Sequence, residues 1–488
     1  MMKKFNLRPI TLILCIVLAG CHFDENKSSV EVVQQTQRNE LWYSEHYGEI
    51  KQIVDERLVT WQVTGSSCYP ILTLDPLPLF DAFSAKSAGL LTYKRPYDSG
   101  PVKYTEISSL DEVCKDGFIS TSDKSDYTFD AQAIFELFWL DMKNHYAFFS
   151  ERNIDWDAVY NQYAGQLSDA NETKLLGVFR EILELLNDGH TRLYFSLEEE
   201  PINFEAKPTL SKRLEREAVA LNLSGELAEK YIETQTNQLQ MTIAQYLDQE
   251  TKQDFIMRKQ QSPNGPNWGV INTGGQHIGY LKLYHFQNFI DVAGIERQDI
   301  SYANAAFNDL LDEIFTDLSR TNQLIIDIRD NEGGHDIQAL ELIKRFISQN
   351  TLVWDISTFY AGALHQLTSV YAEPDNDRPY YLKDIYLLTS NGTFSASETF
   401  ALAMSALPQV TLVGRATAGA TSDTFPRMLP NGWIYELSNE YYENSLDLNV
   451  EVLGVPVDVE VDPFDITFRK ENKDAAIEKV LSLLSYEP

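Results

Sequence analysis

Three short segments of this chain carry the residue types that acyl-transfer chemistry needs. His190 follows an Asp-Gly pair, and Ser395 precedes a helical pattern. A serine hydroxyl is a poor nucleophile until a neighbouring base takes its proton, and an imidazole with a pKa of about 6.5 can do this near neutral pH. Gly333 and Gly334 lie in the remaining segment, between the other two along the chain. Glycine N–H groups can approach a developing oxyanion closely, so these types together predict nucleophilic catalysis at a carbonyl.

Ser395 lies where a buried strand expected at 385–388 gives way to an apolar helix. Helix N-termini present free N–H groups and a positive dipole end, which favour developing negative charge. The N–H of Ala396 would be one such donor. A purely structural alternative is that Ser395 caps this helix, with Glu398 completing a capping box. Ser397 is the nearby competitor for the nucleophile.

Gly333 and Gly334 follow an apolar strand expected at 324–328. They fit an oxyanion hole, and the same two glycines also fit a simple turn between strand and helix. Asp327 and Arg329 lie in or next to this strand, and we expect them to form a structural ion pair.

Taken in this order, the segments resemble the tail-specific and tricorn-type serine peptidases, a family that includes C-terminal-processing peptidases and retinoid-binding relatives. The segments are 186–191, 325–334 and 393–398, the last followed by the glycine-rich stretch 414–420. The resemblance covers roughly residues 125–200 and 275–462. It implies a serine-type endopeptidase that acts on peptide or protein substrates without a cofactor. The implied fold is α/β, with a ClpP/crotonase-like ββα spiral catalytic domain.

The resemblance implies that Ser395 is the nucleophile and His190 the general base. The C-terminal-processing branch supplies a lysine 25 residues after the serine, and this position is Ala420 here. No lysine occurs between Lys383 and Lys470. The sequence therefore matches the tricorn-like branch, in which a histidine serves as base.

A third group is needed to orient the far nitrogen of His190. Tricorn-type relatives use a serine just before the histidine together with a glutamate near the C-terminal strands. The residue before the histidine is Gly189, so that serine is absent. Glu451 is the predicted glutamate, and Asp458 and Glu440 are alternatives.

Two other functions are compatible with the same fold. One is a non-catalytic protein that binds an apolar ligand, as the retinoid-binding relatives do, and the other is an esterase. Retention of both Ser395 and His190 favours peptide hydrolysis over simple binding.

Composition limits the class of protein further. The chain has 488 residues, 43% of them hydrophobic, which is typical of a globular protein with more than one domain. Its 72 acidic and 40 basic residues give a formal charge of −32. This sign repels phosphate backbones, so we expect no nucleic-acid partner.

The N-terminus predicts export and lipid attachment. Basic residues precede an apolar run at 10–18, which is too short to span a bilayer and is typical of a signal peptide. The run ends in Leu-Ala-Gly-Cys, which resembles the lipobox of bacterial lipoproteins and makes Cys21 the expected lipidation site. His22 follows in place of the Asp that retains some lipoproteins at the inner membrane. We therefore expect a lipid-anchored outer-membrane protein facing the periplasm; an ordinary signal peptide is the alternative.

Two cysteines remain once Cys15 leaves with the signal peptide and Cys21 is lipidated. In an oxidising compartment Cys68 and Cys114 are expected to form a disulfide. Two free thiols or half of a metal site are the alternatives. Neither CxxC nor HExxH occurs, and no metal site is expected.

Patterning along the chain predicts six segments. Short β-branched runs with Pro and Gly indicate an early β module, and apolar residues at helical spacing indicate the bundle after it. A later polar stretch almost free of Gly and Pro predicts helices where many relatives carry a PDZ module. The segments are a signal peptide (1–20), a polar tether (21–40), a small β-rich module (41–125), a helical bundle ending in Asp-Gly-His (126–200), a helical insertion (201–270) and the α/β catalytic domain (271–488).

Overall fold

The computed structural model describes residues 39–485, except for 55–56, 66, 75–82, 88, 95–100, 116–127, 197–198, 205–209, 263 and 288–299. The predicted signal peptide and Cys21, the predicted lipidation site, lie outside the described residues.

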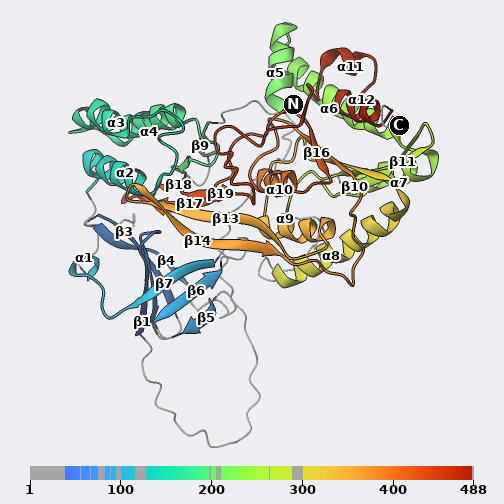
Figure 1. The fold of residues 1–488 in the computed structure, drawn as a ribbon. Coiled ribbons are helices and arrows are strands. Elements are labelled where there is room, and N and C mark those ends of the chain that lie inside the picture. Colours follow the sequence, from blue (N-terminus) through green and yellow to red (C-terminus); the bar gives the residue numbers. More distant parts are fainter. Residues whose placement is uncertain are drawn as a thin grey trace, which may run out of the picture. The chain divides into compact units, whose positions relative to one another are not determined.

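The chain from residue 39 begins with a seven-stranded antiparallel sheet in the order β4-β3-β2-β1-β7-β6-β5 (Figure 1). Buried and partly exposed residues alternate along β3, as expected for a sheet with one face on a core. Cys68 in β4 and Cys114 in α1 are joined by a disulfide, as predicted. The bounds are β1 Asn39–Ser44, β2 Glu49–Val54, β3 Arg57–Thr64, β4 Ser67–Leu74, β5 Phe83–Ser87, β6 Leu90–Lys94, β7 Pro101–Ile107 and α1 Glu112–Lys115.

Three helices follow: α2 (Ala131–His145), α3 (Trp156–Tyr163) and α4 (Glu172–Leu186). The side chains of Asp130, Asp155 and Asn171 each accept a hydrogen bond from a backbone N–H three residues later, which caps the three helix N-termini. Asn187 takes a left-handed conformation with φ of 47° at the end of α4. This residue ends the helix and starts the turn that carries His190.

The polar insertion forms helices, as its composition predicted. They are α5 (Leu210–Ala220), α6 (Glu226–Tyr246) and α7 (Gln249–Gln261). No strand is found among the described residues between 204 and 267, in keeping with helices at the position expected for a PDZ module.

A six-stranded sheet in the order β10-β11-β12-β15-β16-β20 forms the centre of the C-terminal α/β part of the chain. Only its β10–β11 pair is antiparallel. The strands are β10 Asn267–Thr273, β11 Gln276–Lys282, β12 Gln323–Asp327, β15 Ile385–Thr389, β16 Val410–Gly414 and β20 Val459–Glu460, and the main connecting helices are α8 Ile300–Asp317, α9 Asp336–Ile343 and α10 Ala396–Ser405.

Helices cover both faces of this sheet (Figure 1). Alternate residues of β12 separate the two cores: Leu324 and Ile326 pack with α8, α9 and α10, whereas Ile325 packs with α6, α7 and α12 (Ala475–Ser485). A short helix, α11 (Ile466–Lys470), precedes α12. The strands are buried on both faces, which explains why they read as continuous apolar runs.

Two smaller sheets complete the domain. One has the order β14-β13-β19 and the other β17-β18-β8-β9. β8 comes directly after His190 and pairs with β18, so that Arg192 lies opposite Glu436. The strands are β8 Arg192–Tyr194, β9 Ile202–Asn203, β13 Thr351–Tyr360, β14 Ala363–Ala372, β17 Thr424–Met428, β18 Ile434–Ser438 and β19 Glu440–Glu443.

The architecture confirms the predicted fold class, an α/β catalytic domain preceded by helices and a small β-rich sheet. Within the described part of the chain, no helix has the length and apolarity needed to cross a bilayer.

Candidate active site

The two residues predicted to carry the chemistry meet in the structure. His190 Nε2 lies 3.0 Å from Ser395 Oγ although the residues are 205 positions apart in the chain. His190 is brought there by α4 and the β8–β18 pair, and Ser395 by the turn between β15 and α10. The distance is short enough for direct proton transfer from the hydroxyl to the imidazole.

Ser395 has a strained backbone. Its φ is 59° and its ψ is −131°, a conformation that L-residues rarely adopt. The residue occupies the N-cap position of α10, and its N–H donates to Glu398 Oε2 at 3.2 Å. The capping box with Glu398 is present, and the same serine hydroxyl lies against His190.

Gly333 lies directly against the serine, whereas Gly334 lies against the backbone of Phe286. A Cβ at Gly333 would come within 2.6 Å of Ser395 Cβ and 2.9 Å of Ala396 N, so a side chain at 333 would enter the reaction space. The Gly333 N–H donates to Asn331 Oδ1 at 2.9 Å. Among the described residues no acceptor is found for the N–H groups of Gly334 and Ala396. The oxyanion role of Gly333, Gly334 and Ala396 stays a prediction.

His190 is buried and electrically neutral in this setting. Burial is the main cause that lowers its pKa to about 3, and the nearby Arg192 acts in the same direction. Asp188 and the backbone of Ser422 oppose the shift. The imidazole is therefore in its base form at neutral pH, as general-base catalysis requires.

Phe394 fills the space that a side chain at position 189 would occupy. Its ring lies against the His190 ring with a centroid distance of 4.6 Å. A Cβ at Gly189 would lie 2.6 Å from Phe394 Cε2. With phenylalanine at 394, a side chain at 189 would therefore clash with the ring.

Glu451 is connected to His190 indirectly, through the backbone of residues 421 and 422. Its Oε2 accepts hydrogen bonds from Thr421 N at 2.6 Å, Thr421 Oγ1 at 2.8 Å and Ser422 N at 3.1 Å. Burial, together with the negative charges of Asp188 and Glu398, raises the pKa of Glu451 to about 8. No hydrogen bond joins Glu451 to His190 within the described residues. The orienting role of Glu451 stays a prediction, with the 421–422 backbone as the connecting segment.

The two alternatives to Glu451 have other partners. Asp458 Oδ2 accepts from Leu412 N at 2.8 Å, and Glu440 accepts from the Tyr47 hydroxyl. Each therefore has a contact that fixes a neighbouring strand or sheet.

Ser397, the competing nucleophile, is fully buried and has a structural role. Its hydroxyl donates toward Asn331 O and Phe394 O, both at 2.7 Å, and accepts from Phe394 N at 2.8 Å. These bonds hold the loop that contains Asn331 against the turn 394–397.

Ala420 shows what replaces the lysine of the processing branch. Its N–H donates to Glu398 Oε2 at 2.9 Å, and Gly419 N donates to Glu398 Oε1 at 2.5 Å. The buried carboxylate of Glu398 thus fixes the 417–420 loop against the first turn of α10.

Asp327 and Arg329 form the predicted ion pair, with Arg329 Nη2 2.6 Å from Asp327 Oδ2. Arg329 also pairs with Asp474 at 2.9 Å, and both groups are buried. The pair ties the end of β12 to the start of α12.

Two protein-family models match parts of the chain. The model of peptidase family S41 matches residues 277–461, and the model of the tricorn protease C1 domain matches residues 130–184. The chain contains a peptidase family S41 domain. The matched range includes Ser395, both glycines and Glu451, whereas His190 lies just beyond the C1 match.

Two carboxyl-terminal-processing proteases are among the similar curated proteins. The one from Picosynechococcus sp. is 24% identical over 215 residues, 44% of this chain and 46% of the relative. The one from Synechocystis sp. is 24% identical over 231 residues, 47% of this chain and 49% of the relative. The matches thus span about half the length of these relatives.

A crystal structure of a candidate peptidase from Parabacteroides merdae shares the fold. It has a TM-score of 0.53 and 21% identity, and the comparison covers 73% of this chain and 97% of that chain.

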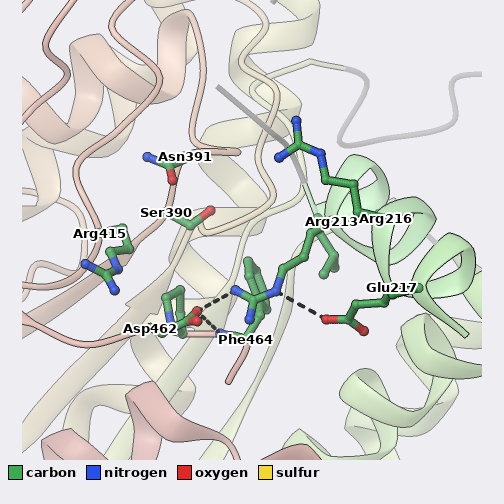
Figure 2. Close-up of a pocket in the computed structure, with 11 residues that line it drawn as sticks. Arg213, Arg216, Glu217, Ser390, Asn391, Arg415, Asp462 and Phe464 are labelled. Atoms are coloured by element: carbon green, nitrogen blue, oxygen red, sulfur yellow. Dashed lines mark hydrogen bonds and ion pairs between the residues drawn. The ribbon is translucent and has the colours of Figure 1, made fainter. Parts of the chain in front are cut away.

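A pocket of about 440 Å³ lies near the S41 domain's strand ends, between α5 and the residues that follow β15 and β16. Figure 2 shows Arg213 reaching from α5 to Asp462, with Arg415 and Asn391 on the other side. Arg213 Nη1 lies 2.6 Å from Asp462 Oδ1, which attaches α5 to the segment after β20. Neither Ser395 nor His190 is among the described residues that line this pocket.

Within the described ranges, no group of three or more His, Cys, Asp or Glu side chains is arranged to hold a metal ion.

Sequence reasoning missed several buried polar residues around the S41 site. Asp188, Arg152 and Tyr146 form a network behind His190, and Glu398 holds the loop behind Ser395. Glu398 was noted only as part of a capping box. Asp188 could have been found from its position two residues before the histidine, where a short carboxylate readily accepts a backbone N–H. Arg152 gives no signal in the sequence.

Proposed function

We propose that this chain is a serine-type endopeptidase that hydrolyses peptide bonds in peptide or protein substrates. The observation that supports it most directly is the 3.0 Å approach of His190 Nε2 to Ser395 Oγ. The S41 domain match and the curated relatives add the reaction class.

The chemistry follows from the positions of these groups. His190 Nε2 takes the proton from Ser395 Oγ as Oγ forms a bond to the peptide carbonyl carbon. The N–H groups of Gly334 and Ala396 stabilise the resulting oxyanion. The imidazolium then gives its proton to the leaving amide nitrogen, the C–N bond breaks, and Ser395 carries the acyl group as an ester. A water molecule, deprotonated by His190, hydrolyses this ester and restores the serine.

Replacement of the nucleophile tests this proposal. In Ser395→Ala, covalent labelling by a fluorophosphonate probe and cleavage of casein are expected to fall to background, because no hydroxyl remains for His190 to activate. Ser319→Ala, at an exposed serine in the 3₁₀ turn Leu318–Arg320 that follows α8, is the matched control and should label and cleave like the wild type. Full labelling of the Ser395→Ala protein would refute the assignment. Turnover of simple esters without peptide cleavage would instead favour the esterase.

We further propose that the protein is anchored through acylated Cys21 to the outer membrane and faces the periplasm. The lipobox-like sequence at 18–21 supports attachment, and the Cys68–Cys114 disulfide fits an oxidising compartment. In a bacterial host, an alkyne-tagged fatty acid should be incorporated into the wild-type protein and not into Cys21→Ala. Equal incorporation in both proteins, or recovery of the wild type in the cytosol, would overturn this localisation.

A further inference from the structure

Arg152 lies behind the histidine turn and has no assigned role in the reaction. It follows α2 in the chain, and its side chain is only 6% exposed. Its Nη1 donates to Leu186 O at 3.1 Å and to Asn187 O at 2.6 Å. These are the last carbonyls of α4, a helix whose own last turn has no basic residue. Arg152 therefore satisfies the helix end and balances its negative dipole at the point where the His190 turn begins.

The second guanidinium nitrogen faces two carboxyl groups. Arg152 Nη2 lies 3.6 Å from Asp188 Oδ2 and 3.8 Å from Glu451 Oε1. Both carboxyl side chains are fully buried. A single positive charge thus lies between the histidine turn and the C-terminal segment that carries Glu451.

Asp188 connects Arg152 to the base. Its Oδ1 accepts a hydrogen bond from the backbone N–H of His190 at 2.9 Å, and its Oδ2 accepts one from the Tyr146 hydroxyl at 2.8 Å. Burial raises the pKa of Asp188, but the charge of Arg152 and the neighbouring His190 lower it below its ordinary value overall. Asp188 is therefore ionised and can hold the backbone at 190 firmly.

We propose that Arg152 is a positioning residue for the His190 base: it joins the end of α4, Asp188 and Glu451 into one unit that fixes the imidazole beside Ser395. This inference rests on the proposed peptidase function and adds to it a specific role for a buried cation.

The proposed role of Arg152 predicts the direction in which the pH dependence shifts when its charge is removed. The charged groups that act on His190 are Arg192, Asp188 and Arg152. Asp188 in turn interacts with the Tyr146 hydroxyl and Glu451, and Glu451 interacts with Glu398. Removal of the Arg152 charge leaves more net negative charge near the ring. The imidazolium is then favoured, so the base form should be lost at a higher pH than in the wild type.

The test compares Arg152→Met, Arg152→Lys and the control Arg180→Met, an exposed arginine on α4. The second-order rate of fluorophosphonate labelling at Ser395 is measured from pH 2.5 to 9, so that the range includes the acidic limb of His190. Circular dichroism at each pH confirms folding. In Arg152→Met we expect a loss of about tenfold to a hundredfold at pH 7 and an acidic limb displaced to higher pH. Arg152→Lys keeps the charge, so it should retain the wild-type acidic limb with a smaller loss of rate. Arg180→Met should match the wild type.

Two results would overturn the inference. The first is a folded Arg152→Met protein that has the rate and the pH profile of the wild type. The second is a rate loss no larger than the unfolded fraction of Arg152→Met accounts for, with a wild-type pH profile in the folded fraction. The Ser395→Ala protein separates this failure from failure of the proposed function. If that variant is silent while Arg152→Met behaves as the wild type, only the role of Arg152 is lost.

Discussion

Ser395 combines a reactive position with an unfavourable backbone. A residue held at φ of 59° and ψ of −131° costs on the order of 1–3 kcal/mol, which its surroundings must offset. Glu398 contributes by accepting the Ser395 N–H, and the absence of a Cβ at Gly333 leaves the serine room. The sequence predicted the serine, the histidine and the glycines from their types and order. It could not predict the strain, because backbone conformation at a single non-glycine residue has no local signature.

Glu451 provides a pH-dependent prediction at the residue scale. With a pKa raised to about 8, it gains its negative charge as the pH rises through that value. The new charge favours the His190 imidazolium and so strengthens the base, and labelling of Ser395 should accelerate a few-fold between pH 7 and pH 9. Glu451→Gln should lack this rise, whereas Glu184→Gln, exposed on α4, should keep it. An identical alkaline rise in Glu451→Gln would contradict the assignment.

Stability should follow the same titration. The raised folded-state pKa means that the contribution of Glu451 to stability is fully present below its ordinary value of 4.5 and is lost as the pH rises through about 8. The free energy of unfolding of the wild type should therefore fall relative to that of Glu451→Gln between pH 5 and pH 9.

Among the elements, those of the central sheet were the easiest to predict. The apolar runs that form β12, β15 and β16 are buried on both faces, and the helical patterns between them are strong. β8 is different: it has three residues, and its partner β18 lies more than 230 positions away. Local periodicity carries no information on such a pairing, yet this pairing delivers His190 to Ser395.

The turn before β8 and the turn before α10 fit each other through Gly189 and Phe394. Gly189→Ser would place a Cβ 2.6 Å from the Phe394 ring, so we expect kcat/KM for a peptide substrate to fall about tenfold or more as the His190 turn shifts. Phe394→Ala removes the obstacle, and the double variant should lose less activity than the two single losses combined. Strict additivity in this double-mutant cycle would show that the two turns are not coupled.

Across the whole molecule, buried charge connects segments that sequence analysis treated separately. Arg427 in β17 pairs with Asp141 in α2 at 2.5 Å and donates to Thr64 in β3 at 2.8 Å. One guanidinium thus links the N-terminal sheet, the helices and the catalytic domain. The sequence predicted a β-rich start, a helical middle and an α/β end, because composition and periodicity report on elements. It could not predict how these parts join, since the joining contacts are single polar residues far apart in the chain.

The most direct test of the account is to identify the atom that becomes acylated or phosphonylated. The purified protein is treated with a fluorophosphonate at pH 7.5, digested, and mapped by tandem mass spectrometry, in parallel with His190→Ala. The account predicts one adduct, on Ser395, that forms at least about a hundredfold more slowly without the imidazole. An adduct on Ser397 or another residue, or equal modification of Ser395 in the His190→Ala protein, would contradict it.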